Sequence, residues 1–403
     1  MRKPFHKKLI EKIIEGILTL SGGITSLAVI LIVIFLFKEG LGLFNRSPIS
    51  DGFVLVVNKN NPVSEIDSKT VKKIFDQEIT NWQSITGKND TIILLHLDDI
   101  TTYYSEEQIG ANMENLPSCI SNVTDSISGI IGFVPQSYIT KGFKGKEIKA
   151  ENVKASEFFG GTEWYPTAEP SAQLGILPLL LGTLWVSFGA ILLSLPLGLA
   201  VAIYMAEIAD DRVRRFFKPL IELLAGIPSV IYGFFGLVVL VPLIQKVFNL
   251  PVGETALAGS IILAIMALPT IITIAEDAIR TTPRAMKEAS LALGASHWQT
   301  IYRIVIPYSI SGITAAAILG IGRAIGETMA VLMVTGNAAV IPHSFLEPVR
   351  TIPATIAAEL GESSQGGLHY QSLFILGCIL FIITLVINLT VEYISSRNKF
   401  YKR

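Results

Sequence analysis

Charged residues are absent from six long stretches of this 403-residue chain, and no other feature of the sequence constrains its fold as strongly. The apolar core of a lipid bilayer is about 30 Å thick and is spanned by roughly 20 apolar residues in a helix. A helix also satisfies its own backbone hydrogen bonds, which lipid cannot do. We therefore predict an all-α polytopic membrane protein with six transmembrane helices, at about 15–37, 174–206, 217–245, 255–276, 308–336 and 370–393.

The composition supports this interpretation and excludes others. Only 16% of the residues are charged, against about 25% in ordinary soluble domains. The formal net charge of −1 gives no general electrostatic reason to bind nucleic acid, so we expect the lipid bilayer and no nucleic acid. The two cysteines, Cys119 and Cys378, lie far apart, and the five histidines are dispersed. We therefore expect no disulfide framework, no metal site and no catalytic residue.

Lysine and arginine are concentrated in alternate connections between the expected helices. The amino terminus, the second and fourth connections and the carboxyl-terminal tail are basic, whereas the third connection has only Lys246 and the fifth only Arg350. Because basic loops face the cytoplasm, we predict a bacterial cytoplasmic (inner) membrane protein with both termini inside and residues 38–170 outside. The first apolar run is long and lacks an A-x-A cleavage site, which favours an uncleaved anchor over a signal peptide.

The fourth connection, residues 277–307, has the pattern of two short helices separated by a glycine. A Thr-Pro pair is suited to begin the first helix, and Gly294 supplies the left-handed residue beyond its end. Ser296 and Gln299 have the spacing of a capping box that begins the second helix. The residues expected on one face of that second helix are Trp298, Ile301, Tyr302 and Val305.

The amino-acid motif of this loop identifies a protein family more specifically than its helix pattern does. The loop resembles the EAA signature of ABC importer permeases, with two conservative departures. It reads Glu-Ala-Ser, three residues, Gly, nine residues and then Ile-Val-Ile-Pro. In that family the first helix docks into a cleft of the ATPase subunit. The resemblance assigns this contact to Glu288, Ala289, Ser290, Gly294, Ile304 and Pro307. The chain has no phosphate-binding G-x-x-x-x-G-K-S/T loop, so ATP and Mg are expected on a partner ATPase and no cofactor on this chain.

Two charges lie inside the fifth expected helix. Arg323 and Glu327 are four residues apart and share one face if the helix is continuous. A central Arg costs roughly 2.5–3.5 kcal/mol to insert, so it should meet a partner or an aqueous path. One interpretation is a structural ion pair. The other is an anion pathway, in which Arg323 offsets the desolvation of an oxyanion and Glu327 prevents overly tight binding. Gly320, Gly322 and Gly326 would allow close approach by a helix or a hydrated ion.

The run from Gly322 to Val331, G-R-A-I-G-E-T-M-A-V, resembles the PstC family of phosphate permease subunits, which are binding-protein-dependent type I ABC importer permeases. The run L-A-G-I-P-S-V-I-Y-G, which begins at Leu224, resembles the same family. The similarity covers most of residues 155–395 and implies a MetI-like fold that forms half of a translocation pore. It implicates Arg323 and Glu327 in a substrate pathway, to which we add Thr328 from the same run. Ser229 and Tyr232, beside Pro228, are further candidates for lining the pathway, although helix packing is the simpler explanation for these two.

The same resemblance implies partners. They are a second permease subunit similar to PstA, two ATPase subunits similar to PstB and an extracytoplasmic phosphate-binding protein similar to PstS. On this interpretation the chain consists of a tail and first helix at 1–37, an extracytoplasmic α/β insert at 38–170 and a permease core at 171–403.

The insert is too regular for a loop. Strands are expected at 53–57, 91–97 and 129–134, and Asp67 can cap a helix. The run that begins at Val56, V-V-N-K-N-N-P, resembles part of one lobe of a periplasmic phosphate-binding protein. Where that family binds its anion, this chain reads H-L-D-D-I-T-T, and two carboxylates would repel phosphate. We therefore expect the insert to be a structural or docking cap.

Three alternatives remain open at this point. A permease for another oxyanion, molybdate or sulfate, would keep the same loop and differ only around Arg323 and in its partners. A membrane sensor predicts that the isolated insert, residues 51–165, binds a ligand. A secondary transporter predicts uptake driven by an ion gradient, without an ATPase partner.

Overall fold

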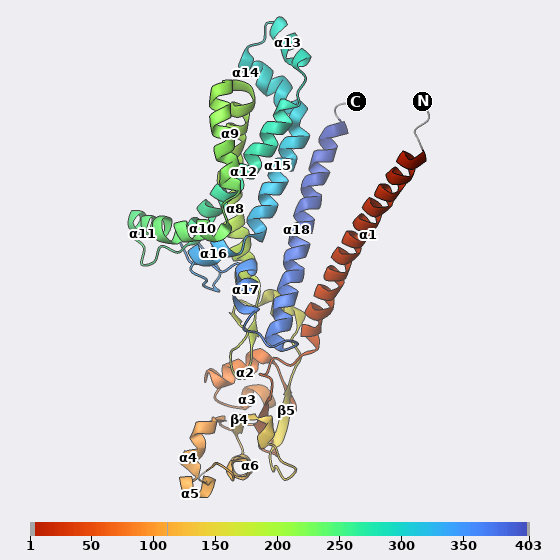
Figure 1. Ribbon diagram of the computed structural model, residues 1–403. Helices are drawn as coiled ribbons and strands as arrows, with labels where there is room; N and C mark the ends of the chain where they lie inside the picture. The colour runs from red at the N-terminus through yellow and green to blue at the C-terminus, as the bar shows by residue number, and fades with distance from the viewer. Residues whose placement is uncertain (1–4, 111, 401–403) are drawn as a thin grey trace.

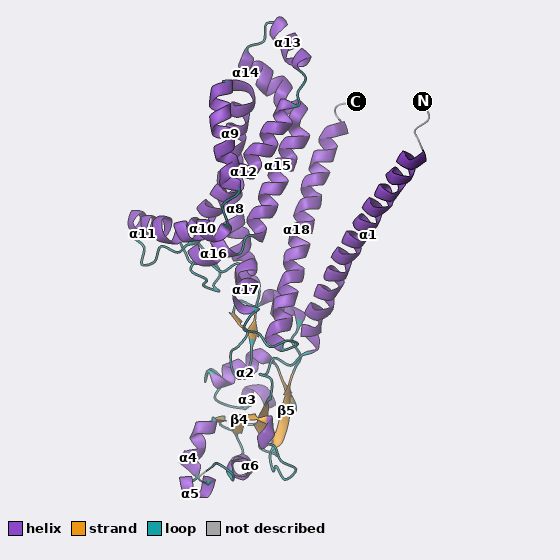
Figure 2. Cartoon of the chain, in the orientation of Figure 1, coloured by secondary structure: helices purple, strands orange, loops and turns teal. Residues whose placement is uncertain are grey.

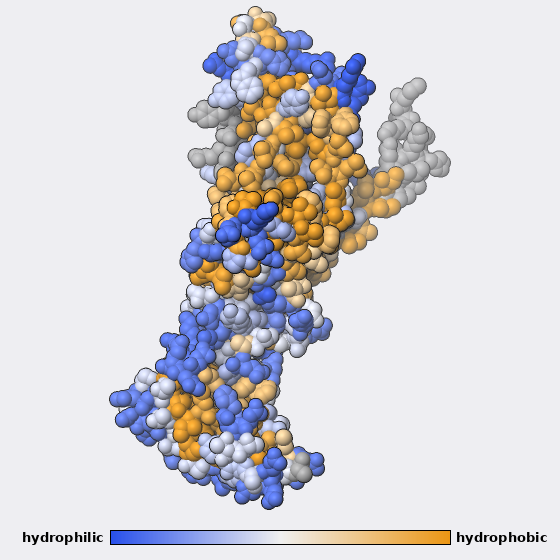
Figure 3. Space-filling model, turned by 90° about the vertical axis from the view of Figure 1, so that its left-hand side faces the viewer, coloured by the Kyte–Doolittle hydropathy of each residue, from blue (hydrophilic) through white to orange (hydrophobic). Residues whose placement is uncertain are grey.

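The computed structural model describes residues 5–110 and 112–400, which form a helical bundle with an α/β insert at one end (Figure 1, Figure 2). Within the described residues, six helical segments are long and apolar enough to cross a membrane. They comprise α1 (Phe5–Leu41), α8 (Leu177–Ile203), α10 and α11 (Ser229–Phe235, Val241–Phe248), α12 (Ala256–Arg280), α14 and α15 (His297–Thr300, Ile306–Gly326) and α18 (Leu368–Phe400). Figure 3 shows a hydrophobic band over the bundle. The predicted fold class is confirmed.

The third predicted span, 217–245, is wrong as a single helix. Helix α9 (Asp211–Ala225) ends before Pro228, and α10 starts after it. Proline has no N–H with which to bond the carbonyl of Leu224, four residues earlier. That carbonyl instead accepts a hydrogen bond from the Tyr232 hydroxyl at 2.8 Å. The break changes the direction of the chain, since Figure 1 shows α9 along the bundle and α10 and α11 across it.

The fifth predicted span, 308–336, is also wrong as a single helix. Helix α15 ends at Gly326, Glu327 is extended with a ψ of 133°, and α16 (Met329–Val334) begins two residues later. Glycine near a helix end weakens the helix. The Glu327 carboxylate then accepts the Ala330 N–H at 3.4 Å, which gives one of the free N–H groups of α16 a partner.

Helix α12 is the central helix of the bundle and packs against both α8 and α15. The contact with α15 is close because a Cβ at Gly312 would overlap Ala278. Helix α1 packs against α18, where Gly40 lies against the backbone of Ile375, and the two diverge toward the end that carries α13 (Arg284–Ala292) (Figure 1). We call this the α13 end and the opposite end the insert end. The first residues of α1 and the last of α18 lie toward the α13 end (Figure 1).

The insert is built on a five-stranded sheet with the order β2-β5-β1-β4-β3. Strand β1 (Phe53–Val57) is antiparallel to β4 (Ile130–Pro135) and to β5 (Lys146–Ala150). Strand β3 (Ile93–Leu95) pairs in parallel with β4, and β2 (Glu65–Ile66) pairs in parallel with β5. The three strands predicted from the sequence are confirmed, with ends that differ by up to two residues.

Both faces of this sheet are buried. Leu55 and Val57 belong to a core that includes α2 (Ser68–Phe75), whereas Val56 belongs to a core that includes α6 (Leu116–Ser126). This alternation follows from the two-residue period of a strand. The predicted cap of α2 is confirmed, because the Thr70 N–H donates to Asp67 at 2.7 Å. The shorter helices of the insert are α3 (Gln83–Thr86), α4 (Ile100–Tyr103) and α5 (Glu106–Ile109).

The chain enters and leaves the insert side by side. Ile49 and Ser171 form an antiparallel bridge, and the Ala172 N–H donates to the Pro48 carbonyl at 2.8 Å. The elements of this junction that precede α8 are α7 (Ala155–Gly160), β6 (Trp164–Tyr165) and β7 (Gln173–Leu174).

An ionic cluster fastens this junction to the bundle. Glu359, at the end of α17 (Ile352–Glu359), accepts a hydrogen bond from the Arg350 guanidinium at 2.8 Å and from the Trp164 indole at 3.2 Å. Its other close neighbour is His369 Nε2, at 2.9 Å. The Glu359 side chain is only 14% exposed. One carboxylate therefore joins the junction, the loop before α17 and the start of α18.

Replacing Glu359 with Gln should destabilise the chain by about 3 kcal/mol, because it leaves the largely buried Arg350 without its carboxylate. We expect a lower thermal unfolding midpoint for the purified protein. Glu362→Gln is the matched control, since Glu362 is exposed nearby and should change the midpoint little. Equal midpoints for the two variants would show that the cluster does not stabilise the junction.

Candidate functional site

Arg323 lies near the end of α15, where the helix is interrupted within the bundle. Its side chain is half-buried, and its guanidinium donates to Thr270 Oγ1 of α12 at 3.4 Å. Among the described residues, the guanidinium makes no ion pair with a carboxylate. The structural ion pair between Arg323 and Glu327 is therefore wrong. Glu327 lies beyond the helix end and caps α16 instead, so no carboxylate of the described residues compensates the Arg323 charge.

The glycines beside Arg323 have different surroundings. A Cβ at Gly320 would overlap Ile271 of α12, which confirms that Gly320 allows helix packing. Gly322 and Gly326 have no heavy atom within 4 Å of their Cβ positions, apart from the local backbone. This chain therefore leaves space next to the arginine, which another subunit or water can fill.

The other predicted pathway residues lie on helices that meet near the same interruption. Helix α10 packs against α16, and a Cβ at Gly233 would overlap Ala330. Ser229 begins α10 and is half-buried, as is Thr328, which precedes α16. Tyr232 is buried, and its hydroxyl bonds the end of α9. Its contacts fit the packing role, whereas contact of these residues with a substrate stays a prediction.

The helix pair at the α13 end has the local structure that the sequence predicts. After α13, Gly294 has a φ of +87°, its N–H bonds the Leu291 carbonyl, and the Ala295 N–H bonds the Ser290 carbonyl. These two bonds form a Schellman motif. The predicted capping box of Ser296 and Gln299 at the start of α14 is also present.

The signature residues differ in exposure. Glu288 and Ala289 are exposed on α13, while the half-buried Ser290 forms a hydroxyl contact of 2.9 Å with Thr300. Ile304 is half-buried, and Pro307 lies in the first turn of α15. The exposed pair is therefore available to a partner, and Ser290 holds α13 against α14.

The prediction that four residues share one face after the capping box is wrong. Ile301 and Val305 are buried, whereas Trp298 and Tyr302 are 64% and 68% exposed. A π-helical turn at Ile301–Val305 changes the number of residues per turn. The i, i+3, i+4, i+7 spacing of an α-helix therefore does not place these four residues on one face. Leu293, between the two short helices, is 89% exposed. The α13 end thus presents large apolar side chains that the chain itself does not cover.

A buried carboxylate lies behind these helices, at a position near the inner end of the fourth expected span where the sequence suggests an ordinary interfacial charge. Glu276 of α12 is 1% exposed, and three cations surround it: Arg280 at 3.4 Å, Lys218 at 3.7 Å and Arg214 at 4.0 Å. Arg214 and Lys218 come from α9. The cluster therefore joins α9 to α12 at the α13 end.

A second ion pair extends this cluster to α13. Lys287 of α13 lies 2.5 Å from Glu207, in the turn that follows α8. Arg214 donates to the carbonyl of Met205 in the same turn at 2.9 Å. A continuous set of contacts therefore runs from α13 through the end of α8 to Glu276 and α12.

Three features define the chain as a multi-pass membrane transport subunit. They are the membrane-length helices, an arginine without a carboxylate partner among the described residues at a helix interruption, and a projecting helix pair. The model of the family "Binding-protein-dependent transport system inner membrane component" matches residues 194–400, and a "PBP superfamily domain" matches residues 36–176. The chain belongs to the first of these families. It is an ABC importer permease of the inner membrane, with a MetI-like fold and an α/β insert.

Individual relatives agree with the family. The chain is 39% identical over 259 residues to "Probable ABC transporter permease protein YqgH" of Bacillus subtilis, which covers 64% of this chain and 84% of that protein. It is also 39% identical over 259 residues to "Phosphate transport system permease protein PstC" of Mesorhizobium japonicum. That match covers 60% of this chain and 78% of the relative.

Solved structures were compared as well. An inward-facing MetNI methionine ABC transporter chain matches with a TM-score of 0.42 and 19% identity, over 56% of this chain and 94% of that chain. A phosphate transport receptor from Vibrio cholerae matches with a TM-score of 0.20 and 23% identity, over 27% of this chain and half of the receptor.

Proposed function

We propose that this chain is the transmembrane permease subunit of an ATP-driven phosphate importer and forms half of its translocation pore. The observation that carries the proposal is the half-buried Arg323, which has no carboxylate partner among the described residues and has unfilled space beside it. An arginine in an apolar bundle favours a passing oxyanion, because the anion compensates its charge. The relatives named as PstC support phosphate as that oxyanion.

The orientation and partners follow from the same proposal. The α13 end and both termini face the cytoplasm, where the basic connections belong, and the insert lies outside. A second, PstA-like permease subunit completes the pore, and a PstS-like binding protein delivers phosphate from outside. Two PstB-like subunits bind ATP and Mg, since the sequence lacks the G-x-x-x-x-G-K-S/T loop that binds ATP phosphates. Their closure moves α13, and the contacts through Glu207 and Glu276 pass this movement to α8, α9 and α12.

Uptake of labelled phosphate by membranes that contain the assembled complex tests this function. We expect uptake that requires ATP and that excess molybdate or sulfate does not suppress. Suppression by either anion to the level given by excess unlabelled phosphate would instead support the alternative oxyanion permease. Uptake that persists without ATP and collapses with the ion gradient would support the secondary transporter.

A cysteine at Ala289 should crosslink to the ATPase subunit in the assembled complex, because Ala289 is exposed on α13 within the signature. The product is detected as a band that contains both chains. Lys88→Cys, on an exposed position of the insert, is the matched control and should give no such band. Failure of the Ala289 variant to capture an ATPase, when the reagent labels both proteins, would contradict the assigned coupling contact.

A further inference from the structure

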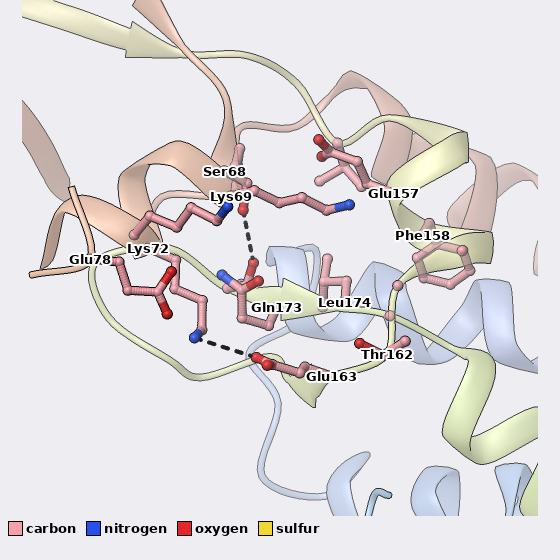
Figure 4. A pocket seen from close by; sticks show the side chains of 17 residues that line it. Ser68, Lys69, Lys72, Glu78, Glu157, Phe158, Thr162, Glu163, Gln173 and Leu174 are labelled. Carbon is pink, nitrogen blue, oxygen red and sulfur yellow. Dashed lines mark hydrogen bonds and ion pairs between the residues drawn. The ribbon is translucent and has the colours of Figure 1, made fainter. Parts of the chain in front are cut away.

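A cavity of about 270 Å³ lies between α2 of the insert and the junction that leads into α8 (Figure 4). Buried Phe158 and Leu174 form part of its apolar lining. Its walls are held together, since Ser68 Oγ lies 2.8 Å from Ser171 Oγ and both residues are buried. The cavity is therefore a preformed part of the junction, with an apolar lining and charged groups around it. We call it the junction cavity.

Charges of both signs line the junction cavity. Lys69, Lys72 and Lys73 come from neighbouring turns of α2, because they have i, i+3 and i+4 spacing. The opposing carboxylates are Glu78, Glu157 and Glu163. This equal number of cations and carboxylates distinguishes the cavity from a simple anion site.

Only one of these three lysines forms ion pairs among the described residues. Lys72 lies 2.7 Å from Asp76 and 3.6 Å from Glu163. Lys69 and Lys73 have no ion pair among the described residues. Figure 4 shows Lys69 extending across the cavity toward Glu157. Two ammonium groups are therefore free to bind a ligand that enters the cavity.

The mixed charges define the chemistry of that ligand. Ammonium groups bind anionic oxygens, whereas an ionised carboxylate only accepts hydrogen bonds and repels an anion that has no proton to donate. Inorganic phosphate still carries a proton near neutral pH, because it has one more ionisable O–H group than a phosphate ester, whereas sulfate carries none. Burial, followed by the charge of Asp67, raises the pKa of Glu157, while the charge of Lys69 acts in the opposite direction.

We propose that the junction cavity is a binding site for a protonated oxyanion, hydrogen phosphate, with Lys69 and Lys73 on its anionic oxygens, Glu157 accepting the hydrogen bond of its O–H group, and Glu78 repelling anions that have no proton to donate. The cavity differs from the position at which the insert resembles a phosphate-binding protein, which reads H-L-D-D-I-T-T. The choice of phosphate rests on the proposed function.

The position of the cavity suits delivery toward the bundle. Lys72, Thr162, Glu163 and Gln173 line both the junction cavity and an open hollow of about 810 Å³. The hollow continues to the loop that follows α16, where residues 339–341, 343 and 347–348 line it. The hollow thus connects the junction cavity to the outer side of the permease core; most of its lining is apolar, and Lys72, Gln173 and His343 are among its polar residues.

Equilibrium dialysis of the full-length chain with labelled inorganic phosphate tests the site. The Arg323→Gln background removes the proposed pore site, and we expect about one phosphate per chain to remain bound. In this background, Lys69→Gln with Lys73→Gln should weaken binding by about tenfold or more. Lys69→Arg with Lys73→Arg keeps both charges and should preserve binding. This control separates an effect of lost charge from an effect of lost folding. Lys88→Gln is the exposed control on the insert and should have no effect.

Sulfate competition tests the role of the carboxylates. Excess sulfate should not displace phosphate from the Arg323→Gln protein, whereas Glu78→Gln with Glu157→Gln should allow displacement, because the amides also donate hydrogen bonds. Equal displacement in both proteins, or no phosphate binding in the Arg323→Gln background, would overturn the junction site. These outcomes leave the proposed function intact if the assembled complex still takes up phosphate. Bound phosphate without any uptake would instead contradict the proposed function alone.

Discussion

Replacing Arg323 with Gln should lower phosphate uptake by the assembled complex by about a hundredfold. The substitution keeps a hydrogen-bond donor near Thr270 but removes the positive charge that compensates an oxyanion inside the bundle. Truncating one member of a buried charge pair costs 2–5 kcal/mol or more, and about 3 kcal/mol corresponds to a hundredfold change. The measurement is the initial rate of labelled phosphate uptake at saturating ATP, in membranes that contain equal amounts of complex.

Two further variants separate charge from geometry at this site. Arg323→Lys keeps the charge and should retain a measurable part of the uptake, although it loses the planar guanidinium. Arg212→Gln removes an exposed arginine near the α13 end and should leave uptake unchanged. Wild-type uptake by Arg323→Gln, in a complex that still contains all its subunits, would remove the assigned role of the arginine.

Replacing Glu276 with Gln should have the second largest effect. The amide is nearly the same size as the carboxylate, but it leaves Arg214, Lys218 and Arg280 around an uncharged group. Removing one partner from a buried ionic cluster costs about 3–5 kcal/mol. We expect a lower thermal midpoint of the purified chain. We also expect a lower ratio of phosphate transported to ATP hydrolysed, because the contacts from α13 to α12 are weakened.

Asp277→Asn is the matched control for the buried carboxylate. Asp277 follows Glu276 in the chain and pairs with Lys218 at 3.3 Å, but its side chain is 63% exposed. An exposed pair contributes about 0–1 kcal/mol, so this variant should change both the midpoint and the transport ratio little. If Glu276→Gln lowers the midpoint without changing the ratio, the cluster is structural and takes no part in coupling.

The membrane spans could be predicted because their length and lack of charge are set by the bilayer alone. The coupling helices could also be predicted, since Gly294 and the capping box act within a few residues of themselves. The two helix interruptions could not. A proline inside a span either bends or ends a helix, and the outcome at Pro228 depends on Tyr232 binding the freed carbonyl. At Glu327 the outcome depends on the carboxylate capping the next helix.

The charged clusters depend on contacts that sequence spacing does not reveal. Glu276 is buried because two of its cations lie about 60 residues earlier, on α9. The junction cavity exists because α2 lies against a segment about 90 residues further along the chain. Lys69 therefore has the pattern of an ordinary exposed helix residue, and only the docked structure places it opposite Glu157.

The bridge between Ile49 and Ser171 separates the outer module from the membrane helices. Since the polypeptide returns almost to where it departed, a gene segment encoding the outer module can be gained or lost at one point, without pulling apart the membrane helices on either side. A closed neck of this kind lets the outer module vary in size while the lipid-embedded helices keep their arrangement.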